Sequence, residues 1–431
     1  MLRHIDLATL SPAERSALTT RSAVPDPSVR EAAADICEQI RTGGDQALDE
    51  LSARFGGGRP GGARVSAGEL RSALDSVAPD VRAALEMAVA NVEAYHRAQL
   101  PGVLTVETRP GVTVERRWSA LTRVGCYVPG GKAAYPSSLI MTAVPARVAG
   151  VDEIVVATPA APDGTLDQTL LAAAALVGVT EVYAMGGAQA VAALAYGTGT
   201  IPRVQKIVGP GNAWVTAAKL HVYGTCAIDL PAGPSEVLVI ADSTADPHLV
   251  AIDLLCQAEH GPDSPALLVT TDPNLLLEVE GALADLLPGL QRSEILAKAL
   301  ADHGLAIVAR DLATAVEFAN QYAPEHVTVL TDDATTVADQ VTGAGSVYVG
   351  EWSPESAGDY ATGANHVLPT GGLAAACGPL SVEDFGSWRQ IQTLTQEGLT
   401  ALSPTITTLA AAEGLTAHGL ACTMRFERNN R

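Results

Sequence analysis

A glutamine and a histidine stand three residues apart in the stretch LLCQAEHG, at Gln257 and His260. Residues three apart lie on one face of an α-helix, so both side chains could converge on one metal ion. The same stretch has the features of a helix end, because Gly261 and Pro262 stop a helix and a histidine in the last turn suits the helix dipole. Taken alone, the pair favours the helix end.

A carboxylate and an imidazole are adjacent in YAPEHV, at Glu325 and His326. Pro324 ends the helical pattern before them, so both lie in a non-helical stretch that precedes a strand. A histidine beside a carboxylate is a sound general base, because the neighbouring charge is expected to hold its pKa near or above neutrality. A solvated turn is the alternative, and it is the commoner context for an isolated Glu-His pair.

Two later stretches carry residues of the same kinds. The polar segment SPESAGDYATGANHVLPTGG contributes Glu355, Asp359 and His366, and AAAEGLTAHGLA contributes Glu413 and His418. Asp359 could give an oxygen ligand to a divalent metal, although a carboxylate in a Gly-rich turn more often caps the backbone. For Glu413 and His418, near the chain end, an ordinary surface is the alternative.

The glycine-rich turns VPGGKAAYPSS, MGGAQA and VGPGNAW each follow an apolar run. Glycine after a strand lets the backbone approach a phosphate at the next helix. None of the three completes G-x-G-x-x-G, and GCYVPGGK misses the phosphate-loop pattern by one inserted residue, with Ala133 in place of Ser or Thr. This excludes a phosphate-loop ATPase but leaves open a nucleotide bound in another pose, or turns without any ligand.

Short apolar runs alternate with Ala-rich helical patterns from Gly125 to about His221, and a second such series begins at Val237. Strands spaced by helices predict parallel sheets, and thus two doubly wound α/β domains. Residues 80–99 have apolar positions at helical spacing, and VLTVETRPGVTVERR is a β-hairpin candidate around Pro110 and Gly111.

The bulk composition limits the class of protein. The 431 residues include 48 Asp and Glu against 27 Lys and Arg, which argues against nucleic acid or an anionic membrane as the main partner. No secretion signal or membrane span is expected. Six scattered cysteines without C-x-x-C fit reduced thiols in a cytoplasmic enzyme. Cys256, beside Gln257, suggests a catalytic thiolate, but a lone cysteine is more often a small buried apolar residue.

Several long motifs, in this order and at these separations, resemble histidinol dehydrogenase. They are YVPGG, GGAQAVAALAYGT, VGPGNAWVTAAK, AGPSEVLVIAD, DLLCQAEHGPDS, YAPEHV, WSPESAGDYATGANHVLPT and AAAEGLTAHGLA. The resemblance implies oxidation of L-histidinol, through L-histidinaldehyde, to L-histidine, the last two steps of histidine biosynthesis, with two NAD+ consumed. It also implies a homodimer with shared active sites.

The resemblance further assigns roles by position. The zinc ligands would be Gln257, His260, Asp359 and, from the partner subunit, His418. Such a donor set suits Zn2+ and tolerates Mn2+, and the ion would hold the substrate's nitrogens.

By the same resemblance, His326 would be the general base of both oxidations, and Glu325 would activate the water that hydrates the aldehyde. Ser235, His366 and Glu413 match substrate contacts, together with the metal ligands and His326, and Tyr127, Gln189 and Asn212 match NAD contacts.

The fold implied by the resemblance is two Rossmann-like domains, one inserted in the other, with small helical end segments in an intertwined homodimer. We expect an N-terminal helical segment (1–24), an outer domain with the metal and substrate residues (25–126 and 236–380), an inserted NAD-binding domain (127–235) and a C-terminal dimerisation tail (381–431). One alternative is a zinc hydrolase with Glu325 as base. It lacks H-E-x-x-H and leaves the glycine turns unexplained.

Overall fold

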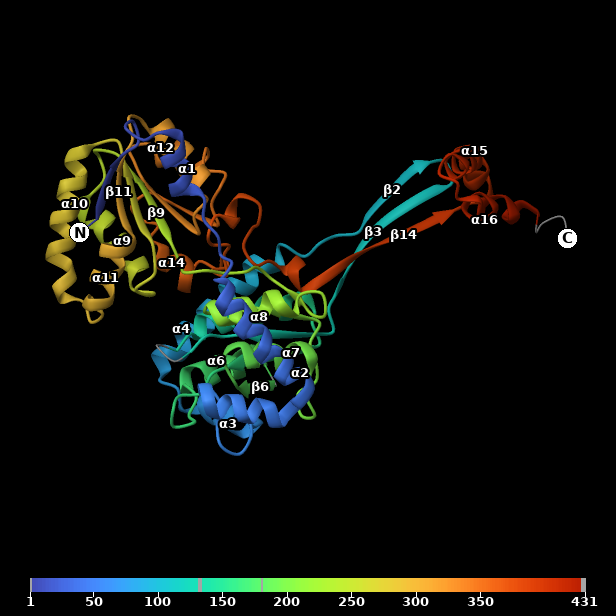
Figure 1. The fold of residues 1–431 in the computed structure, drawn as a ribbon, viewed down its shortest axis with the longest axis horizontal. Helices are drawn as coiled ribbons and strands as arrows, with labels where there is room; N and C mark the ends of the chain where they lie inside the picture. The colour runs from blue at the N-terminus through green and yellow to red at the C-terminus, as the bar shows by residue number, and fades with distance from the viewer. Residues whose placement is uncertain (1, 131–133, 180, 428–431) are drawn as a thin grey trace. The chain divides into compact units, whose positions relative to one another are not determined.

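The computed structural model describes residues 2–130, 134–179 and 181–427, and it divides into two compact units (Figure 1). The first unit comprises Met1–Gln99 and Thr122–Phe385, and the second comprises Leu100–Leu121 and Gly386–Arg431. Both parallel sheets belong to the first unit. The expected α/β class with parallel sheets is therefore confirmed.

One sheet of the first unit has six parallel strands within the described residues. Their spatial order is β1 (Arg3–Asp6), β11 (Gly304–Val308), β10 (Ala266–Thr270), β9 (Val237–Ala241), β12 (His326–Leu330) and β13 (Ser346–Val349). The central strands β9, β10 and β12 are buried along their whole length and mostly apolar, as is expected of strands covered on both faces.

Helices cover both faces of this sheet. One face packs on α9 (Pro247–Ala258), α10 (Pro273–Leu286) and α11 (Ser293–His303). The other packs on α12 (Leu312–Tyr322) and α13 (Ala334–Ala338), and α1 (Pro12–Thr19) contacts α12. Successive residues of β9 alternate between the two cores, with Val237 and Val239 in one and Leu238 and Ile240 in the other.

The other sheet of the first unit has five parallel strands within the described residues. Their order is β6 (Glu181–Ala184), β5 (Glu153–Thr158), β4 (Arg123–Tyr127), β7 (Lys206–Val208) and β8 (Ala227–Ile228). Its helices are α5 (Pro136–Ala149), α6 (Gln168–Val177), α7 (Gly187–Tyr196) and α8 (Ala213–Val222). Along the chain, all these elements lie between β1 and β9 of the larger sheet, which is the order that an inserted domain requires.

The helices in the first third of the chain pack against a different sheet from the one that we expected. Helices α2 (Pro27–Phe55) and α3 (Ala67–Ser76) pack against α6, α7 and α8, and α4 (Pro79–Arg97) packs against α5. Ile36, Ile40 and Leu51 of α2 share one core with the five-stranded sheet. We had expected residues 25–126 to complete the other domain, but the apolar stripe of α2 fits the Ala-rich surfaces of α7 and α8. The expected helical segment 1–24 also begins with a strand, β1.

The ends of several helices are explained by local sequence. Ser11 with Glu14, and Ser66 with Glu69, form capping boxes that start α1 and α3. Helix α2 is kinked at Gly44, whose φ of +56° is accessible to glycine. The long polar segment after β13 contains the short helix α14 (Glu355–Tyr360), where only turns were expected. Three short 3-10 helices, η1 (Leu287–Gly289), η2 (Leu373–Ala375) and η3 (Val382–Phe385), complete the first unit within the described residues.

The second unit contains the antiparallel sheet β14 (Gly386–Leu394), β3 (Val112–Ala120) and β2 (Leu104–Arg109). The predicted hairpin around Gly111 is confirmed as β2 and β3, and Gly111 has a φ of +74°. Two helices follow, α15 (Gln396–Ala412) and α16 (Thr416–Glu427). Residues 100–121 therefore belong with residues 386–431, which are far away in the sequence.

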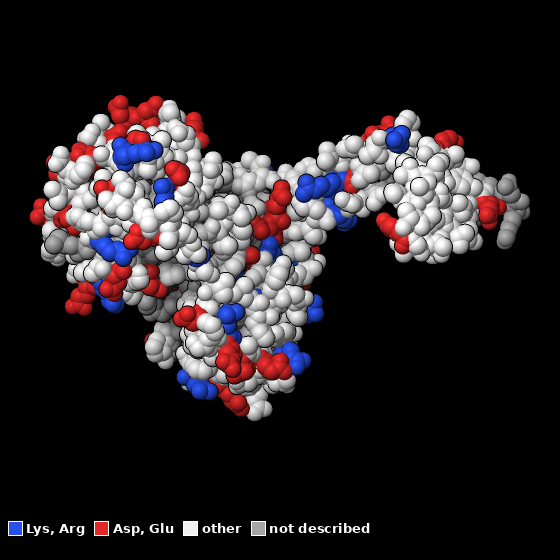
Figure 2. Space-filling model, turned by 45° about the horizontal axis from the view of Figure 1, so that its top comes forward, with Lys and Arg blue, Asp and Glu red and all other residues white. Residues whose placement is uncertain are grey.

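Two surface properties agree with the composition. Acidic side chains outnumber basic ones over the face drawn in Figure 2. Among the described residues, no helix is both long enough and apolar enough to cross a membrane.

Candidate active site

The candidate catalytic residues lie at the amino-terminal edge of the six-stranded sheet. Ser235 and Glu236 directly precede β9, Glu325 directly precedes β12, and His326 is the first residue of β12. Strands β9 and β12 are parallel neighbours, with His326 paired to Val237, so the two entering segments run side by side. Doubly wound sheets usually bind ligands at the carboxyl edge, and this site uses the opposite one.

Glu325 is held by two hydrogen bonds from the segment before β9. Its Oε2 accepts the hydroxyl of Ser235 at 2.5 Å and the backbone N–H of Glu236 at 3.0 Å. Burial nevertheless raises the pKa of Glu325 well above the usual value of a glutamate. A carboxyl group with a raised pKa can exchange a proton near neutral pH, as a water-activating residue must.

Glu236 forms backbone hydrogen bonds with both Glu325 and His326. Its backbone N–H binds Glu325, and its backbone carbonyl accepts the N–H of His326 at 3.2 Å. Its buried carboxylate pairs with Arg21, whose guanidinium stacks on the ring of Tyr322 at 3.5 Å from the centroid. Arg21, in the segment after α1, holds Glu236 in place through this ion pair. Because Glu236 binds both Glu325 and His326, Arg21 positions that pair indirectly.

The imidazole of His326 is buried among acceptors. Its Nδ1 lies 3.2 Å from Oε1 of Gln257 and 3.8 Å from a carboxylate oxygen of both Glu325 and Glu355. Burial lowers the pKa of His326 to about 4, although the charge of Asp359 opposes this. The expectation that a neighbouring charge would hold this pKa near or above neutrality was wrong, because desolvation of the ring outweighs it. A neutral imidazole is the form that a base needs.

Gln257 and His260 lie at a helix end, as one of the two interpretations predicted. Gln257 is in the last turn of α9 and fully buried, and its Nε2 has no hydrogen-bond partner among the described residues. His260 comes after the helix and is exposed, and its N–H binds the carbonyl of Gln257 at 3.2 Å. Since His260 lines the cleft and Gln257 contacts His326, the helix end and a metal site are compatible.

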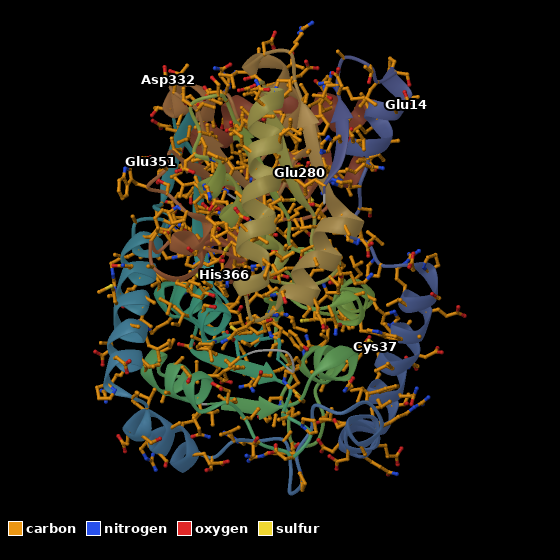
Figure 3. The ribbon with its side chains drawn as sticks, turned by 90° about the vertical axis from the view of Figure 1, so that its left-hand side faces the viewer. Glu14, Cys37, Glu280, Asp332, Glu351 and His366 are labelled. Carbon is orange, nitrogen blue, oxygen red and sulfur yellow. The ribbon has the colours of Figure 1, made fainter. Side chains whose placement is uncertain are left out.

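Asp359 and His366 face each other across the polar segment. Oδ1 of Asp359 lies 3.6 Å from Nδ1 of His366, and Nε2 of His366 lies 3.3 Å from Oγ of Ser138 in α5. Burial opposes ionisation of Asp359, but the hydrogen bond from His366 and the nearby imidazoles hold its pKa below the usual value. Figure 3 shows His366 between the two sheets of the first unit. Asp332, which follows β12, lies at the end of the six-stranded sheet that is farther from the other sheet.

Three of these side chains could hold a metal ion. Ligand atoms of His260, Asp359 and Glu355 all lie within 4.8 Å of one another. Glu355 was noticed in the sequence but given no role. The residue precedes Asp359 by four positions, which is the spacing of neighbours on one helix face, and only the expectation of a loop hid this signal.

A cleft of about 390 Å³ joins these residues to the candidate nucleotide residues. It is lined by Tyr127, at the end of β4, and by Asn212, whose Oδ1 caps α8 at Trp214 and Val215. Strands β4 and β7 meet at the point where the strand order reverses, the usual ligand site of such sheets. The same cleft is lined by Ser235, His260, Glu325, His326, Asp359 and His366.

Gln189 is not among the residues that line this cleft. Its side chain is buried beneath the turn Gly186–Gly187, and its Nε2 lies 3.5 Å from the carbonyl of Gly56. The turn itself is tied to Tyr127, whose hydroxyl accepts the N–H of Gly187 at 3.1 Å. Of the turn VPGGKAAYPSS, residues 131–133 lie outside the described residues, so the comparison of Ala133 with a phosphate loop has no structural test.

Comparison with known proteins identifies the family. A sequence model of histidinol dehydrogenases matches residues 19–426. A histidinol dehydrogenase of Methanothermobacter thermautotrophicus is 47% identical over 89% of this chain and 90% of its own length, and one of Vibrio parahaemolyticus is 44% identical over 99% of both. The crystal structure of the enzyme from Elizabethkingia anophelis superposes with a TM-score of 0.94, at 37% identity, over 100% of this chain and 99% of that one. The chain belongs to the histidinol dehydrogenase family.

The resemblance predicted from the motifs is thus confirmed over nearly the whole chain. Membership in the histidinol dehydrogenase family favours the dehydrogenase over the zinc hydrolase.

Two residues that the family resemblance assigns lie in the second unit. Glu413 follows the last turn of α15, His418 lies in α16, and both side chains are exposed. Their roles in a histidinol dehydrogenase stay predictions.

Cys256 has the properties of a structural residue in this member of the histidinol dehydrogenase family. Burial, with the nearby Glu355 and Asp359, raises the pKa of its thiol. A thiol with a raised pKa carries little thiolate at neutral pH and is a poor nucleophile. All six cysteines lie within the described residues, and all are free.

His96, for which the sequence alone indicated no role, contacts the polar segment beside the candidate site. It is fully buried in α4, and its Nε2 lies 3.2 Å from Nδ2 of Asn365, the neighbour of His366. Asn365 also donates to the carbonyl of Met141 in α5 at 2.8 Å. The polar segment is therefore held against two helices, α4 and α5, directly beside His366.

Proposed function

We propose that this chain catalyses the NAD-dependent oxidation of L-histidinol to L-histidine, through L-histidinaldehyde, in histidine biosynthesis. One observation supports this most strongly. The cleft that Tyr127 and Asn212 line from one sheet is also lined by Glu325, His326 and Asp359 from the other. A nicotinamide and a substrate bound there would meet over an acid-base pair.

The cation would be held by Gln257, His260 and Asp359, with His418 from the partner subunit as the fourth ligand. The buried amide of Gln257, through its oxygen, and the clustered imidazole and carboxylate of His260 and Asp359 fit such an ion. Amide, imidazole and carboxylate donors suit Zn2+ and tolerate Mn2+. When bound, the cation supplies an anchor for the amine and imidazole nitrogens of the substrate.

His326 would take the protons of both oxidations. Its Nε2 is buried and has no hydrogen-bond partner among the described residues, so it is free to accept the hydroxyl proton while the C–H hydrogen leaves as hydride to NAD+. Glu325, held by Ser235 and Glu236, would activate the water that hydrates the aldehyde before the second oxidation. Ser235, His366 and, from the second unit, Glu413 would contact the substrate.

NAD+ would lie along the turns after β4 and β7, against Tyr127 and Asn212. Gln189 would act indirectly, through the Gly186–Gly187 turn above it. Gly209 in the second of these turns has a φ of +111°, and a Cβ there would stand 2.1 Å from the carbonyl oxygen of Tyr127. Glycine at this position lets the turn after β7 lie directly against the end of β4.

A homodimer would complete each site, with one Rossmann-like domain inserted in the other in every subunit. Within the second unit, α15 and α16 carry exposed apolar side chains, as helices that cover a partner would. They are Leu409, Leu415, Leu420 and Met424.

The test is a mixture of the protein, Zn2+, NAD+ and L-histidinol in which NADH absorbance is followed. We expect two NADH for each histidinol consumed, and little activity with simple alcohols that lack the imidazole. No NADH from the zinc-loaded protein would reject the proposal.

A further inference from the structure

Lys219 is a buried cation that the proposed chemistry does not use. It lies in α8, and its side chain is 2% exposed. An ammonium group has three N–H donors, and three acceptors surround this one. Nζ donates to the carbonyl of Gly209 at 3.0 Å and to that of Leu230 at 3.2 Å, and it forms an ion pair with Oδ1 of Asp229.

Asp229 binds the backbone N–H of the same glycine. Its Oδ2 accepts the N–H of Gly209 at 2.6 Å, while its Oδ1 faces the ammonium of Lys219. Burial raises the pKa of Asp229, although the charge of Lys219 opposes this. Since both carboxylate oxygens face donors, a proton on either would displace one of these contacts, and the ionised form is the one that fits. Both polar backbone groups of Gly209 are therefore bound by one ion pair.

The fold brings these three residues together at the carboxyl edge of the five-stranded sheet. Gly209 directly follows β7, and Asp229 directly follows β8. Strands β7 and β8 are parallel neighbours, so their carboxyl ends lie side by side. Helix α8 connects the two strands along the chain, and from it Lys219 reaches the residue that follows each of them.

Gly209 begins the turn 209–212, which lines the cleft that we propose for NAD+. Its φ of +111° favours glycine, and its Cα lies directly against the carbonyl of Tyr127. A turn with glycine at its first and third positions has much conformational freedom, so other contacts must hold it in one conformation. A loop that already has its bound conformation binds a ligand more tightly, because less ordering is needed on binding.

Stability alone does not explain why this pair is charged. A buried ion pair contributes little net stability, because moving two charges out of water costs about as much as their attraction returns. Two apolar side chains of similar volume would fill the same space. They could neither donate to the carbonyl of Gly209 nor accept its N–H. The charged pair therefore supplies a geometry that apolar packing would not.

We propose that Lys219 and Asp229 are positioning residues for NAD+, which hold the turn 209–212 in the conformation that binds the cofactor. This inference rests on the proposed NAD+ site. The effect passes through Gly209 to the turn and to Asn212 at its end, whose Oδ1 caps α8. Neither Lys219 nor Asp229 exchanges a proton with the substrate.

The segment that leads to Ser235 has other contacts that do not involve Lys219. The hydroxyl of Thr216 donates to the carbonyl of Ala232 at 2.7 Å, and the N–H of Gly233 donates to Oγ1 of Thr370 at 2.6 Å. Loss of Lys219 should therefore weaken the binding of the cofactor more than that of histidinol.

Lys219→Met tests the proposal, because methionine fills a similar volume without a donor. The dissociation constant of NADH is measured by titrating its fluorescence with zinc-loaded protein. We expect this constant to rise at least about tenfold, since a hydrogen bond from a charged donor is worth about that factor or more. KM for NAD+ should rise in parallel, whereas KM for histidinol and the affinity for Zn2+ should stay within about threefold of wild type.

Arg123→Met is the matched control. Arg123 begins β4, at the opposite edge of the same sheet, and its buried guanidinium donates to both carboxylate oxygens of Glu181, at 3.0 and 2.8 Å. Its loss should lower the stability against urea but leave the NADH dissociation constant within about threefold of wild type. An increase in that constant equal to that of Lys219→Met would show that the loss of any buried ion pair weakens binding, and would overturn the proposal.

The double variant Lys219→Met/Asp229→Asn decides the question even if Lys219→Met does not fold. Neither charge remains in it, and replacing both members of a buried pair by uncharged side chains is often neutral for stability. The carbonyl of Gly209 still lacks its ammonium donor, so we expect NADH binding at least about tenfold weaker than in wild type. NADH binding equal to that of wild type in this variant, or in folded Lys219→Met, would overturn the proposal. Absence of NADH binding by the wild-type protein would instead reject the proposed NAD+ site itself.

Discussion

Oε1 of Gln257 lies 3.2 Å from Nδ1 of His326, so a proposed cation ligand and the proposed base are in direct contact. Gln257 is in the last turn of α9, and His326 begins β12. Helix α9 and strand β12 both belong to the domain built on the six-stranded sheet. A shift of either element would therefore move the other. Loss of the cation should therefore disturb the base as well as the binding of substrate.

Asp359→Asn should weaken Zn2+ binding. A direct ligand should cost more affinity than the roughly 10–100-fold that loss of an outer partner costs. Chelator competition measures the dissociation constant, and Asp332→Asn, at the other end of the sheet, is the control. An unchanged dissociation constant would remove Asp359 from the ligand set.

Arg21→Met should destabilise the protein and slow the reaction. Breaking a buried ion pair leaves the Glu236 carboxylate uncompensated and costs about 3–5 kcal/mol of unfolding free energy. A loosened Glu236 should also lower kcat by up to about 100-fold, since it positions both Glu325 and His326. Urea unfolding and kcat are the measurements. Arg41→Met, which breaks the exposed pair with Glu38, should change neither.

Asp253→Asn should stabilise the protein at neutral pH. Burial raises the pKa of Asp253 to about 6 from a usual value near 3.8. The folded state therefore binds the proton more tightly than the unfolded state, and unfolding free energy falls as pH rises from about 4 to about 6. Ionisation costs on the order of 3 kcal/mol above that range, and asparagine avoids this cost. Urea unfolding at pH 4 and pH 8 should show the gain at pH 8 only, and an equal gain at both would contradict the assignment.

Cys256→Ser should keep both oxidations. The raised pKa of the thiol makes a covalent thiohemiacetal an unsuitable route. NADH yields from histidinol and from histidinaldehyde are the measurements. Loss of the aldehyde step alone would restore the thiolate hypothesis.

Mixing His326→Ala with His418→Ala should restore part of the activity. Each variant is expected to be inactive, but one site of the hybrid dimer would carry both intact residues. Activity is measured after reversible dissociation and subunit exchange. Exchange without any rescue would show that each site is made from one chain.

The sequence was sufficient to predict the alternation of strands and helices and to identify the family. Buried strands and glycine-rich turns leave strong local patterns. It could not reveal the partner of α2, since an apolar stripe such as Ile36, Ile40 and Leu51 fits either domain equally well. That choice depends on surfaces that exist only after both sheets have formed.

The family resemblance assigned the candidate site residue by residue, and these roles stay predictions, whereas the expected pKa of His326 was wrong. The expectation for His326 considered the charge of its sequence neighbour and missed desolvation, which depends on every element packed around the ring. Glu355 was named but given no role, because the polar segment was expected to form turns and its helical spacing from Asp359 was therefore overlooked.

The use of the amino edge by Ser235, Glu325 and His326 leaves the opposite edge of the same sheet free for engineering. The loop that begins at Thr331 is separated from the acid-base pair by the five residues of β12, or roughly 16 Å. A fluorophore or an affinity tag placed there would report on the enzyme, or immobilise it, without obstructing substrate entry.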